Sequence, residues 1–397
     1  MNVRIANLGA LGCLALAATT VTAEPSRTAA GAAAVSETDA EPPGSPTDDP
    51  PVFLPIHVLP ETMLTGAPDV DLTGGNSTID TTALTINGAT SPYFVHQDAY
   101  AILFAKQFTT LNGVTVVGNS PLIVVASDQI VISGSFDLHG RGSLPGPGAV
   151  TSHTSVGAGG NGGTQPPIDL LRWSGGGGGG GYGSAGAPGS TEIPQAPAGV
   201  GGETYGGAID DPLIGGSPGG AGGFTGLGSA GGGGGALQLS SAVGIFMVGN
   251  INAGGGGGLG GGGSQNGGGG GGAGGEIILE SPTILVGPSP DALVANGGGG
   301  GGGGGAGGST APPGTNGADA GNLGNAAKGG VGGVPQGASG GAGATGTTAP
   351  TTGGSGFSKG GGGGGGVGRI WIRYRADSPP TLRGTITPAP GLDPTLP

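Results

Sequence analysis

Apolar and polar residues alternate along several short stretches of the chain, and long runs of glycine separate these stretches. The last one, GRIWIRYR from Gly368, places Ile370, Ile372 and Tyr374 on one side and arginines on the other. Alternation with a period of two is typical of a strand with one buried face. The pattern predicts a strand that follows directly on the glycine run 360–366.

The apolar stretches recur with the spacing of a repeat. Ala105 and Ala126 are 21 residues apart, and Phe108 and Ile130 are 22 apart. About 20 residues make one turn of a β-solenoid, which consists of two or three short strands joined by tight turns. A fainter turn, TIDTTALTING, precedes them. We predict an all-β fold with little α-helix outside residues 1–23, a parallel β-helix of about five or six coils over residues 76–390.

The same repeat returns three times, from Gly235, Gly275 and Gly368. Aligning the copies predicts two apolar columns in the core, one of Ile123, Leu237, Ile277 and Ile370 and one of Val125, Leu239, Leu279 and Ile372. The alignment also places Glu276 beside Arg369, and Glu280 beside Arg373, on the outer face. Because opposite charges on neighbouring strands attract, these pairs favour this register.

Glycine-rich insertions separate the copies at about residues 141–234, 254–274 and 297–367. Ordering each glycine backbone costs about 1–2 kcal/mol, so an ordered tract needs many compensating hydrogen bonds. Extended left-handed helices of the polyproline type form such bonds between chains when no side chain intervenes. Two alternatives stay open at this point, an ordered bundle of polyglycine II helices and a set of flexible loops.

The first residues have the pattern of an export signal. Residues 1–23 combine Arg4, an apolar centre and small residues before a cleavage site at Ala23. The alternatives are a lipoprotein anchored at Cys13, which lies inside the apolar stretch, and a transmembrane anchor, which Asn7 interrupts. Cleavage after Ala23 leaves no cysteine, which excludes disulfides and cysteine-ligated zinc. We expect a secreted or cell-surface protein without a transmembrane anchor.

Acidic residues outnumber basic ones, and the formal net charge is -13. Many of the acids lie in residues 24–75, a proline-rich segment that we expect to be a disordered arm. We also expect residues 391–397 to be a disordered tail. This charge disfavours nucleic acid and anionic membranes as partners.

Few residues form a pattern typical of catalysis or metal binding. Enzymes that cleave polysaccharides use clustered carboxylates. The candidates here are Asp210 and Asp211, in a sequence typical of a turn, and Asp69 and Asp71, which lack the later ligands of a calcium loop.

The histidines give no stronger signal. His57, His96, His139 and His153 lack the spacing of metal ligands, and His139, beside Arg141 in DLHGRG, has the surroundings that most resemble a site. We therefore predict no catalytic residue, no cofactor and no metal.

The alternation of glycine runs with paired strands resembles the glycine-rich secreted and surface proteins of bacteria that are called PE-PGRS-like. The resemblance covers residues 99–390 and is carried by GGGGGALQLSSAVGIFMVGNINAGGGGG and GGAGGEIILESPTILVG. This chain has the export signal and acidic arm in place of the helical PE domain of that family. The resemblance implies a surface location and glycine helices, and it implies no catalytic residues.

These patterns predict a secreted, non-catalytic structural or cell-surface protein, with cell-wall or matrix polysaccharide as its partner. The first alternative is a solenoid that binds or cleaves carbohydrate, with Trp173, Tyr182 and Tyr205 stacking on sugar rings. The same aromatic residues are also suited to anchoring the glycine tracts. An ice- or mineral-binding surface is a further alternative, but it needs a regular threonine array that the sequence lacks.

Overall fold

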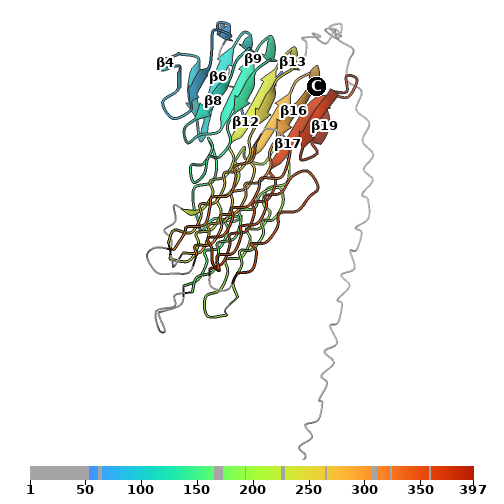
Figure 1. The fold of residues 1–397 in the computed structure, drawn as a ribbon. Coiled ribbons are helices and arrows are strands. Elements are labelled where there is room, and N and C mark those ends of the chain that lie inside the picture. The colour runs from blue at the N-terminus through green and yellow to red at the C-terminus, as the bar shows by residue number, and fades with distance from the viewer. Residues whose placement is uncertain are drawn as a thin grey trace, which may run out of the picture. The chain divides into compact units, whose positions relative to one another are not determined.

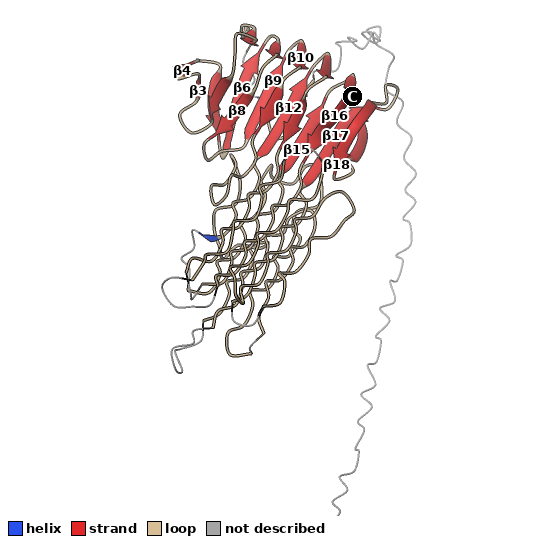
Figure 2. Cartoon of the chain, viewed as in Figure 1, coloured by secondary structure: helices blue, strands red, loops and turns tan. Residues whose placement is uncertain are grey.

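The strands gather into two sheets in which most neighbours run parallel (Figure 1). The structure is a computed structural model, and it describes residues 53–60, 65–164, 173–192, 194–224, 229–263, 266–305, 311–321, 324–356 and 359–397. Residues 1–23, which we expected to be an export signal, and most of residues 24–75, which we expected to be an acidic arm, lie outside the described residues. Strands predominate and helix is almost absent in the described part (Figure 2), which confirms the all-β prediction.

The smaller sheet has seven strands in the order β19-β17-β15-β12-β9-β6-β5. All neighbours are parallel except β5 and β6, which form an antiparallel pair at one edge. The strands are β5 (Phe94–Gln97), β6 (Tyr100–Ala105), β9 (Leu122–Ala126), β12 (Ala236–Ser241), β15 (Glu276–Glu280), β17 (Arg369–Arg375) and β19 (Gly391–Leu396).

The larger sheet follows the order β1-β7-β10-β13-β16-β14-β11-β8-β2-β3-β4, with β18 paired to β16. Its strands are β1 (Val70–Leu72), β2 (Ser77–Asp80), β3 (Thr85–Ile86), β4 (Ala89–Thr90), β7 (Phe108–Thr110), β8 (Val114–Val117), β10 (Gln129–Ile132), β11 (Ser135–Asp137), β13 (Gly244–Met247), β14 (Asn250–Asn252), β16 (Ile284–Val294) and β18 (Thr381–Thr387). Within TIDTTALTING, β2 pairs with β8 in parallel, but β3 turns back antiparallel to β2.

The repeat spacing read from the sequence is confirmed by the strand register. Ala105 pairs with Ala126, and Phe108 pairs with Ile130. Each parallel strand of the smaller sheet therefore lies beside the corresponding strand of the next repeat. The predicted pairing of Ile277 with Ile370 is confirmed as well.

Both predicted columns are wrong by one residue at β9. Leu237 pairs with Leu122 and not with Ile123, and Leu239 pairs with Val124 in place of Val125. A shift of one residue moves a side chain to the opposite face of a strand. Every residue of β9 is buried, so the apolar pattern of LIVVA does not distinguish its two faces.

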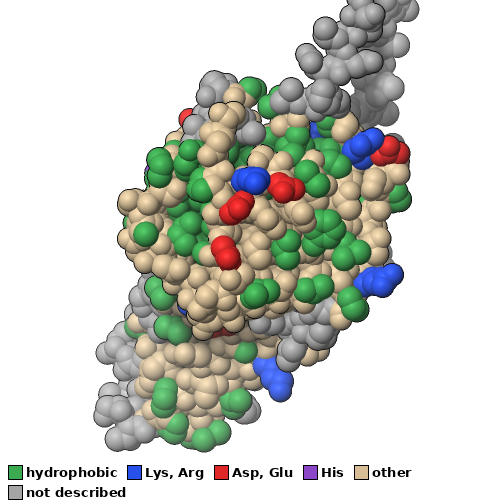
Figure 3. Space-filling view, turned by 90° about the horizontal axis from the view of Figure 1, so that it is seen from above, with side chains coloured by type: hydrophobic (Ala, Val, Ile, Leu, Met, Phe, Trp, Pro, Cys, Tyr) green, Lys and Arg blue, Asp and Glu red, His purple; other side chains and the backbone are tan. Residues whose placement is uncertain are grey.

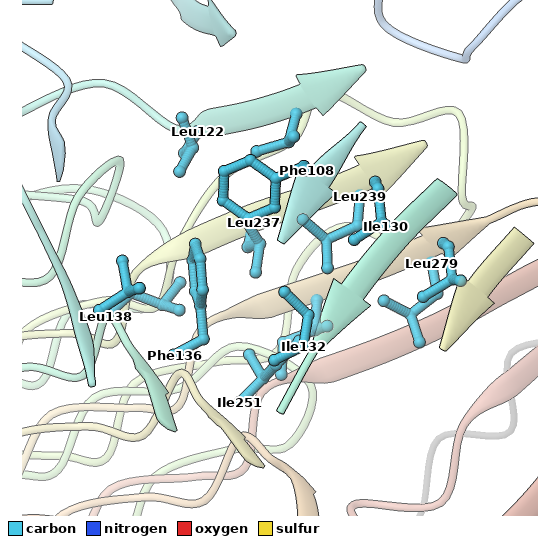
Figure 4. Close-up of a cluster of buried hydrophobic side chains, with 14 of the residues drawn as sticks. Phe108, Leu122, Ile130, Ile132, Phe136, Leu138, Leu237, Leu239, Ile251 and Leu279 are labelled. Carbon is cyan, nitrogen blue, oxygen red and sulfur yellow. The ribbon is translucent and has the colours of Figure 1, made fainter. Parts of the chain in front are cut away.

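The main core lies between the two sheets. Phe108, Ile130 and Ile132 from the larger sheet meet Leu122, Leu237 and Leu239 from the smaller one (Figure 4). These side chains are fully buried, and each contributes about 1.5–3 kcal/mol by leaving water.

A second apolar cluster covers the outer face of the smaller sheet. It contains Ile102, Phe104, Ile123, Val125 and Ile278, together with Val58 and Leu213 from segments that lie across the strands. The central strands β9, β12 and β15 of the smaller sheet are thus buried on both faces.

The glycine tracts lie in the connections 138–235, 253–275 and 295–368, and they run beside one another away from the strands (Figure 1). Successive amides of the tract 268–273 donate to three different neighbouring segments in turn: Gly268 to Gly360, Gly269 to Leu259 and Gly270 to Gly220, then Gly271 to Gly363, Gly272 to Gly256 and Ala273 to Ser217. These N···O distances are 2.9–3.0 Å. The hydrogen bonding therefore repeats every three residues.

The segments approach one another too closely for side chains. A Cβ atom at Gly270 would lie 1.9 Å from the carbonyl oxygen of Gly178, and one at Gly362 would lie 1.9 Å from that of Gly269. Both neighbours are backbone atoms, which cannot turn aside as a flexible side chain can. Glycine is required at these positions by close packing.

Two segments expected to be disordered are ordered. Residues 391–396 form β19 and pair with β17, and residues 53–60 and β1 belong to the segment that we expected to be an acidic arm. Neither segment has a clear alternation of apolar and polar residues. Both are ordered by tertiary contacts, since β19 pairs with β17 and residues 53–60 contact Gln238 and Glu280.

Candidate functional site: a buried charge network beneath two covering segments

Four charged side chains lie in two neighbouring rows on the outer face of the smaller sheet. Glu276 is the lateral neighbour of Arg369, and Glu280 is the lateral neighbour of Arg373, so the predicted charge register is confirmed. This outer face is covered, since Glu276 is 4% exposed and Glu280 is fully buried. Only 9% of the chain is charged, and the face seen in Figure 3 shows few charged side chains among hydrophobic and uncharged ones. A cluster of two buried carboxylates and two half-buried guanidinium groups is therefore a distinctive feature.

The first covering segment is residues 53–60, which we call the strap. The Ile56 N–H donates to the two carboxylate oxygens of Glu280 at 3.3 and 3.2 Å, and the Ile56 carbonyl accepts from Gln238 Nε2 at 2.7 Å. Gln97 on β5 holds the next residues, since it accepts from the Leu59 N–H at 3.0 Å. The strap is thus tied to strands far away in the sequence.

Glu280 is the centre of the first half of the network. Its carboxylate accepts from Ser240 Oγ at 2.9 Å and from Gln238 Nε2 at 3.2 Å, and it forms an ion pair of 2.5 Å with Arg373. Burial raises the pKa of Glu280 above its ordinary value, and the Ser240 and Arg373 contacts oppose that rise. A buried carboxylate needs such partners to stay ionised.

The second covering segment is residues 203–214, which we call the tyrosine loop. The Arg369 guanidinium donates to the carbonyls of Tyr205 and Gly206 at 2.8 and 2.5 Å, and it lies over the ring of Tyr182 at 5.4 Å from the centroid. Arg369 therefore holds the tyrosine loop and does not form a close ion pair with Glu276.

Glu276 lies beneath the tyrosine loop. Its carboxylate accepts from the Ile214 N–H at 3.3 Å and from the Tyr182 hydroxyl. Burial raises the pKa of Glu276 to about 7, although the bonds from Tyr182 and Ile214 favour its ionised form. A cavity of about 330 Å³ adjoins Glu276 and is lined by Tyr182, Tyr205 and Arg369.

The aromatic residues proposed for sugar stacking have different positions. Tyr182 is 2% exposed and packs against Tyr205, with ring centroids 4.7 Å apart. Burial raises the pKa of Tyr182 well above its ordinary value and that of Tyr205 to about 12. Trp173 is half-buried. Tyr182 anchors a glycine tract on the sheet, and its face is not available to a ligand.

The carboxylates proposed as candidates serve local turns. Asp211 accepts from the Gly207 and Ala208 N–H groups at 2.6 and 3.0 Å, which confirms the turn predicted there. Asp71 accepts from the Thr73 N–H at 2.9 Å in the same way. Within the described ranges, no three His, Cys, Asp or Glu side chains gather closely enough to hold a metal ion.

His139 lies in a more distinctive arrangement than the sequence indicated. Its Nδ1 contacts Asp137, whose other oxygen accepts from Arg141 at 2.9 Å. Burial alone raises the pKa of Asp137, but the bond to His139 and the charges of His139 and Arg141 outweigh burial and lower it. His139 and Arg141 line a cavity of about 300 Å³, so a small polar ligand in this cavity would lie beside both side chains.

Sequence reasoning considered His57 only as a metal ligand, and it missed Gln238 and Ser240. His57 lies in the segment assigned to the acidic arm, and no local pattern marks it. Gln238 and Ser240 occupy alternate positions of β12 in GALQLSSAVG. Alternate residues of a strand point to opposite faces, so Gln238 and Ser240 lie on the face away from Leu237 and Leu239. Two polar side chains on this face were the available signal that polar groups cover it.

No helix in the part of the chain that the structure describes is both long and apolar enough to cross a membrane. Comparisons with protein-family models, with curated proteins and with solved structures found no match.

Proposed function

We propose that this chain is an exported, non-catalytic structural protein of the cell surface or extracellular matrix. Its body is a parallel β-helix of about six coils, one for each parallel strand of the smaller sheet, and its glycine tracts form a polyglycine II bundle beside that body. The family resemblance of the glycine layout supports the surface location.

The hydrogen bonding of residues 268–273 is the observation that carries this proposal. Bonds to three neighbours in turn, repeating every three residues, are expected of a helix with three residues per turn inside a bundle. Such a bundle builds a stiff body almost without side chains. A chain selected for a reaction or a ligand needs side chains at its surface, whereas a spacer or matrix element needs stiffness.

The export part of the proposal is tested by mass spectrometry of the fractionated source cells. We expect a chain that begins at Glu24 in the secreted or surface fraction. A cytoplasmic chain that still begins at Met1, or a lipid-modified Cys13, contradicts it. The structural part is tested by deleting the gene and measuring the stiffness and cohesion of the cell surface or matrix, which we expect to fall.

A carbohydrate-binding or carbohydrate-cleaving protein is the second candidate, and the His139 cavity is the observation that favours it. An imidazole held by a carboxylate is an arrangement that accepts protons from hydroxyl groups. The test is a glycan array together with an assay for released reducing sugar, on the chain from Glu24. Binding that is lost in His139→Gln and kept in His153→Gln supports this candidate over a purely structural role.

A further inference from the structure

His57 joins the strap to the tyrosine loop and to β12 at once. Its Nδ1 lies 2.8 Å from Gln238 Oε1, and its Nε2 lies 2.8 Å from the backbone carbonyl oxygen of Asp211. The ring also lies against Tyr100 of β6, with centroids 5.8 Å apart. One imidazole therefore bridges both covering segments and the sheet beneath them.

Both partners of the imidazole are acceptors. The Asp211 carbonyl has no hydrogen to donate. The Gln238 amide is oriented by its other bonds, because its Nε2 donates to the Ile56 carbonyl at 2.7 Å and to Glu280 at 3.2 Å. Turning the amide over would bring its oxygen against those two oxygens. His57 must donate from both nitrogens, and only the protonated ring does so.

We propose that the strap and the tyrosine loop form a proton-dependent clasp, which His57 locks onto the outer face of the smaller sheet when both its ring nitrogens carry protons. Loss of either proton removes one bond and turns a nitrogen lone pair toward an oxygen. Imidazole is the side chain that gains and loses a proton near neutral pH, so the clasp loosens as the solution becomes mildly alkaline.

The surrounding charges are consistent with a protonated ring. The titratable and charged groups on the elements packed against the strap are Glu276 and Glu280 of β15, Arg369, Arg373, Tyr374 and Arg375 of β17, Glu203, Tyr205, Asp210 and Asp211 of the tyrosine loop, His96 of β5, Tyr100 of β6, and Asp98 between β5 and β6. Arg373 is paired with Glu280, and Arg369 is held by loop carbonyls. Glu276 also weakens the clasp as the pH rises. Its carboxyl is buried beneath the tyrosine loop, and loss of its proton leaves an unfavourable charge there.

Release of the clasp would uncover an apolar surface. The strap residue Val58 and the loop residue Leu213 are buried against Ile102, Phe104 and Ile278 on the outer face. Lifting the two segments exposes this cluster without breaking any strand pair. The device therefore changes the surface of the protein and leaves its sheets intact.

Amide exchange with solvent measures the clasp directly. The Ile56 N–H bonds to Glu280 and the Ile214 N–H bonds to Glu276, so their exchange reports opening of the strap and of the loop. Protection, expressed relative to an unstructured peptide at the same pH, is measured by NMR at pH 5.5, 6.5 and 8 on the chain from Glu24. We expect protection of both amides to fall at least tenfold from pH 5.5 to 8, while Val124 in β9 stays protected.

The decisive variant is His57→Asn. His57 has a φ of 63°, a conformation that asparagine tolerates, and the asparagine amide keeps one donor toward Gln238 but does not titrate. We expect its protection to equal that of the wild type at pH 8 and to fall less steeply with pH, with only the part of the fall that Glu276 causes remaining. The control is His96→Asn on β5, which should keep the full pH dependence.

Two further results decide the matter. The ring ¹⁵N shifts of His57 should show both nitrogens protonated at pH 5.5. Glu276→Gln should retain the part of the fall in protection that is lost in His57→Asn. A wild-type clasp equally protected at pH 5.5 and 8, or a fall in His57→Asn as large as that in the wild type, overturns the proposal. Continued protection of Val124 shows in each variant that the sheets are folded.

Discussion

Arg373 of β17 and Glu280 of β15 are lateral neighbours whose side chains meet, with Nη1 of the arginine 2.5 Å from Oε1 of the glutamate. Glu280 is fully buried, and the Arg373 side chain is only 16% exposed. The register of two strands 93 residues apart in the sequence thus places a cation where a buried carboxylate needs one.

Replacing Arg373 by methionine should destabilise the protein, because Glu280 then lacks its cation in the buried network. Breaking such a pair typically costs about 3–5 kcal/mol. The measurement is the free energy of unfolding in urea. The matched control is Arg375→Met, whose partner Asp377 is exposed, and it should cost less than about 1 kcal/mol. Equal losses in the two variants would show that the buried pair has no special role.

Replacing Glu276 by glutamine should remove part of the pH dependence of stability. The pKa of Glu276 is raised from 4.5 to about 7, so the folded state favours the protonated carboxyl. Its contribution is complete below about pH 4.5 and is lost as the pH rises through about 7, which amounts to something on the order of 3 kcal/mol. Urea midpoints at pH 4.5, 6 and 8 should therefore fall with pH less steeply in the variant. An unchanged slope would mean that Glu276 titrates at its ordinary pKa.

Replacing Gly270 by alanine should damage the glycine bundle. The new Cβ would lie 1.9 Å from the Gly178 carbonyl oxygen, and we expect a loss of roughly 1–3 kcal/mol as the segments move apart. Gly321 is the control, because nothing lies within 4 Å of a Cβ there. Gly321→Ala should be neutral or slightly stabilising, since alanine restricts the unfolded chain. If thermal unfolding shows both variants equally stable, the tracts are not closely packed in solution.

The amides of Gly297 to Gly305 should exchange much more slowly than those of a free peptide with the same sequence. In the structure, Gly298 donates to Gly272 and Gly301 donates to Gly269, both at 2.8–2.9 Å. Hydrogen exchange followed by mass spectrometry measures the protection. Exchange at the free-peptide rate throughout this segment would mean that the tracts are loops and would reduce the proposed role to that of a spacer.

Local sequence determined the strands and most of their register. The alternation in GRIWIRYR depends on neighbours within a few residues, and the 21-residue spacing of Ala105 and Ala126 is the length of one repeat. Both are found in the sheets. The alignment failed at Ile123, where apolar residues occupy both faces of β9 and the alternation that fixes a register is missing.

Tertiary structure alone decided what covers the outer face and which glycine tracts are neighbours. The strap meets Gln238 and Glu280, roughly two hundred residues further along the chain, and no local pattern in residues 53–60 records those partners. Glycine has no side chain to distinguish one tract from another. No local pattern therefore predicts the hydrogen bonds from Gly268 to Gly360 and from Gly270 to Gly220. The stacked strands fix the points at which the glycine tracts leave the sheets, and these points determine which tracts lie side by side. Backbone hydrogen bonds between the tracts then complete the packing.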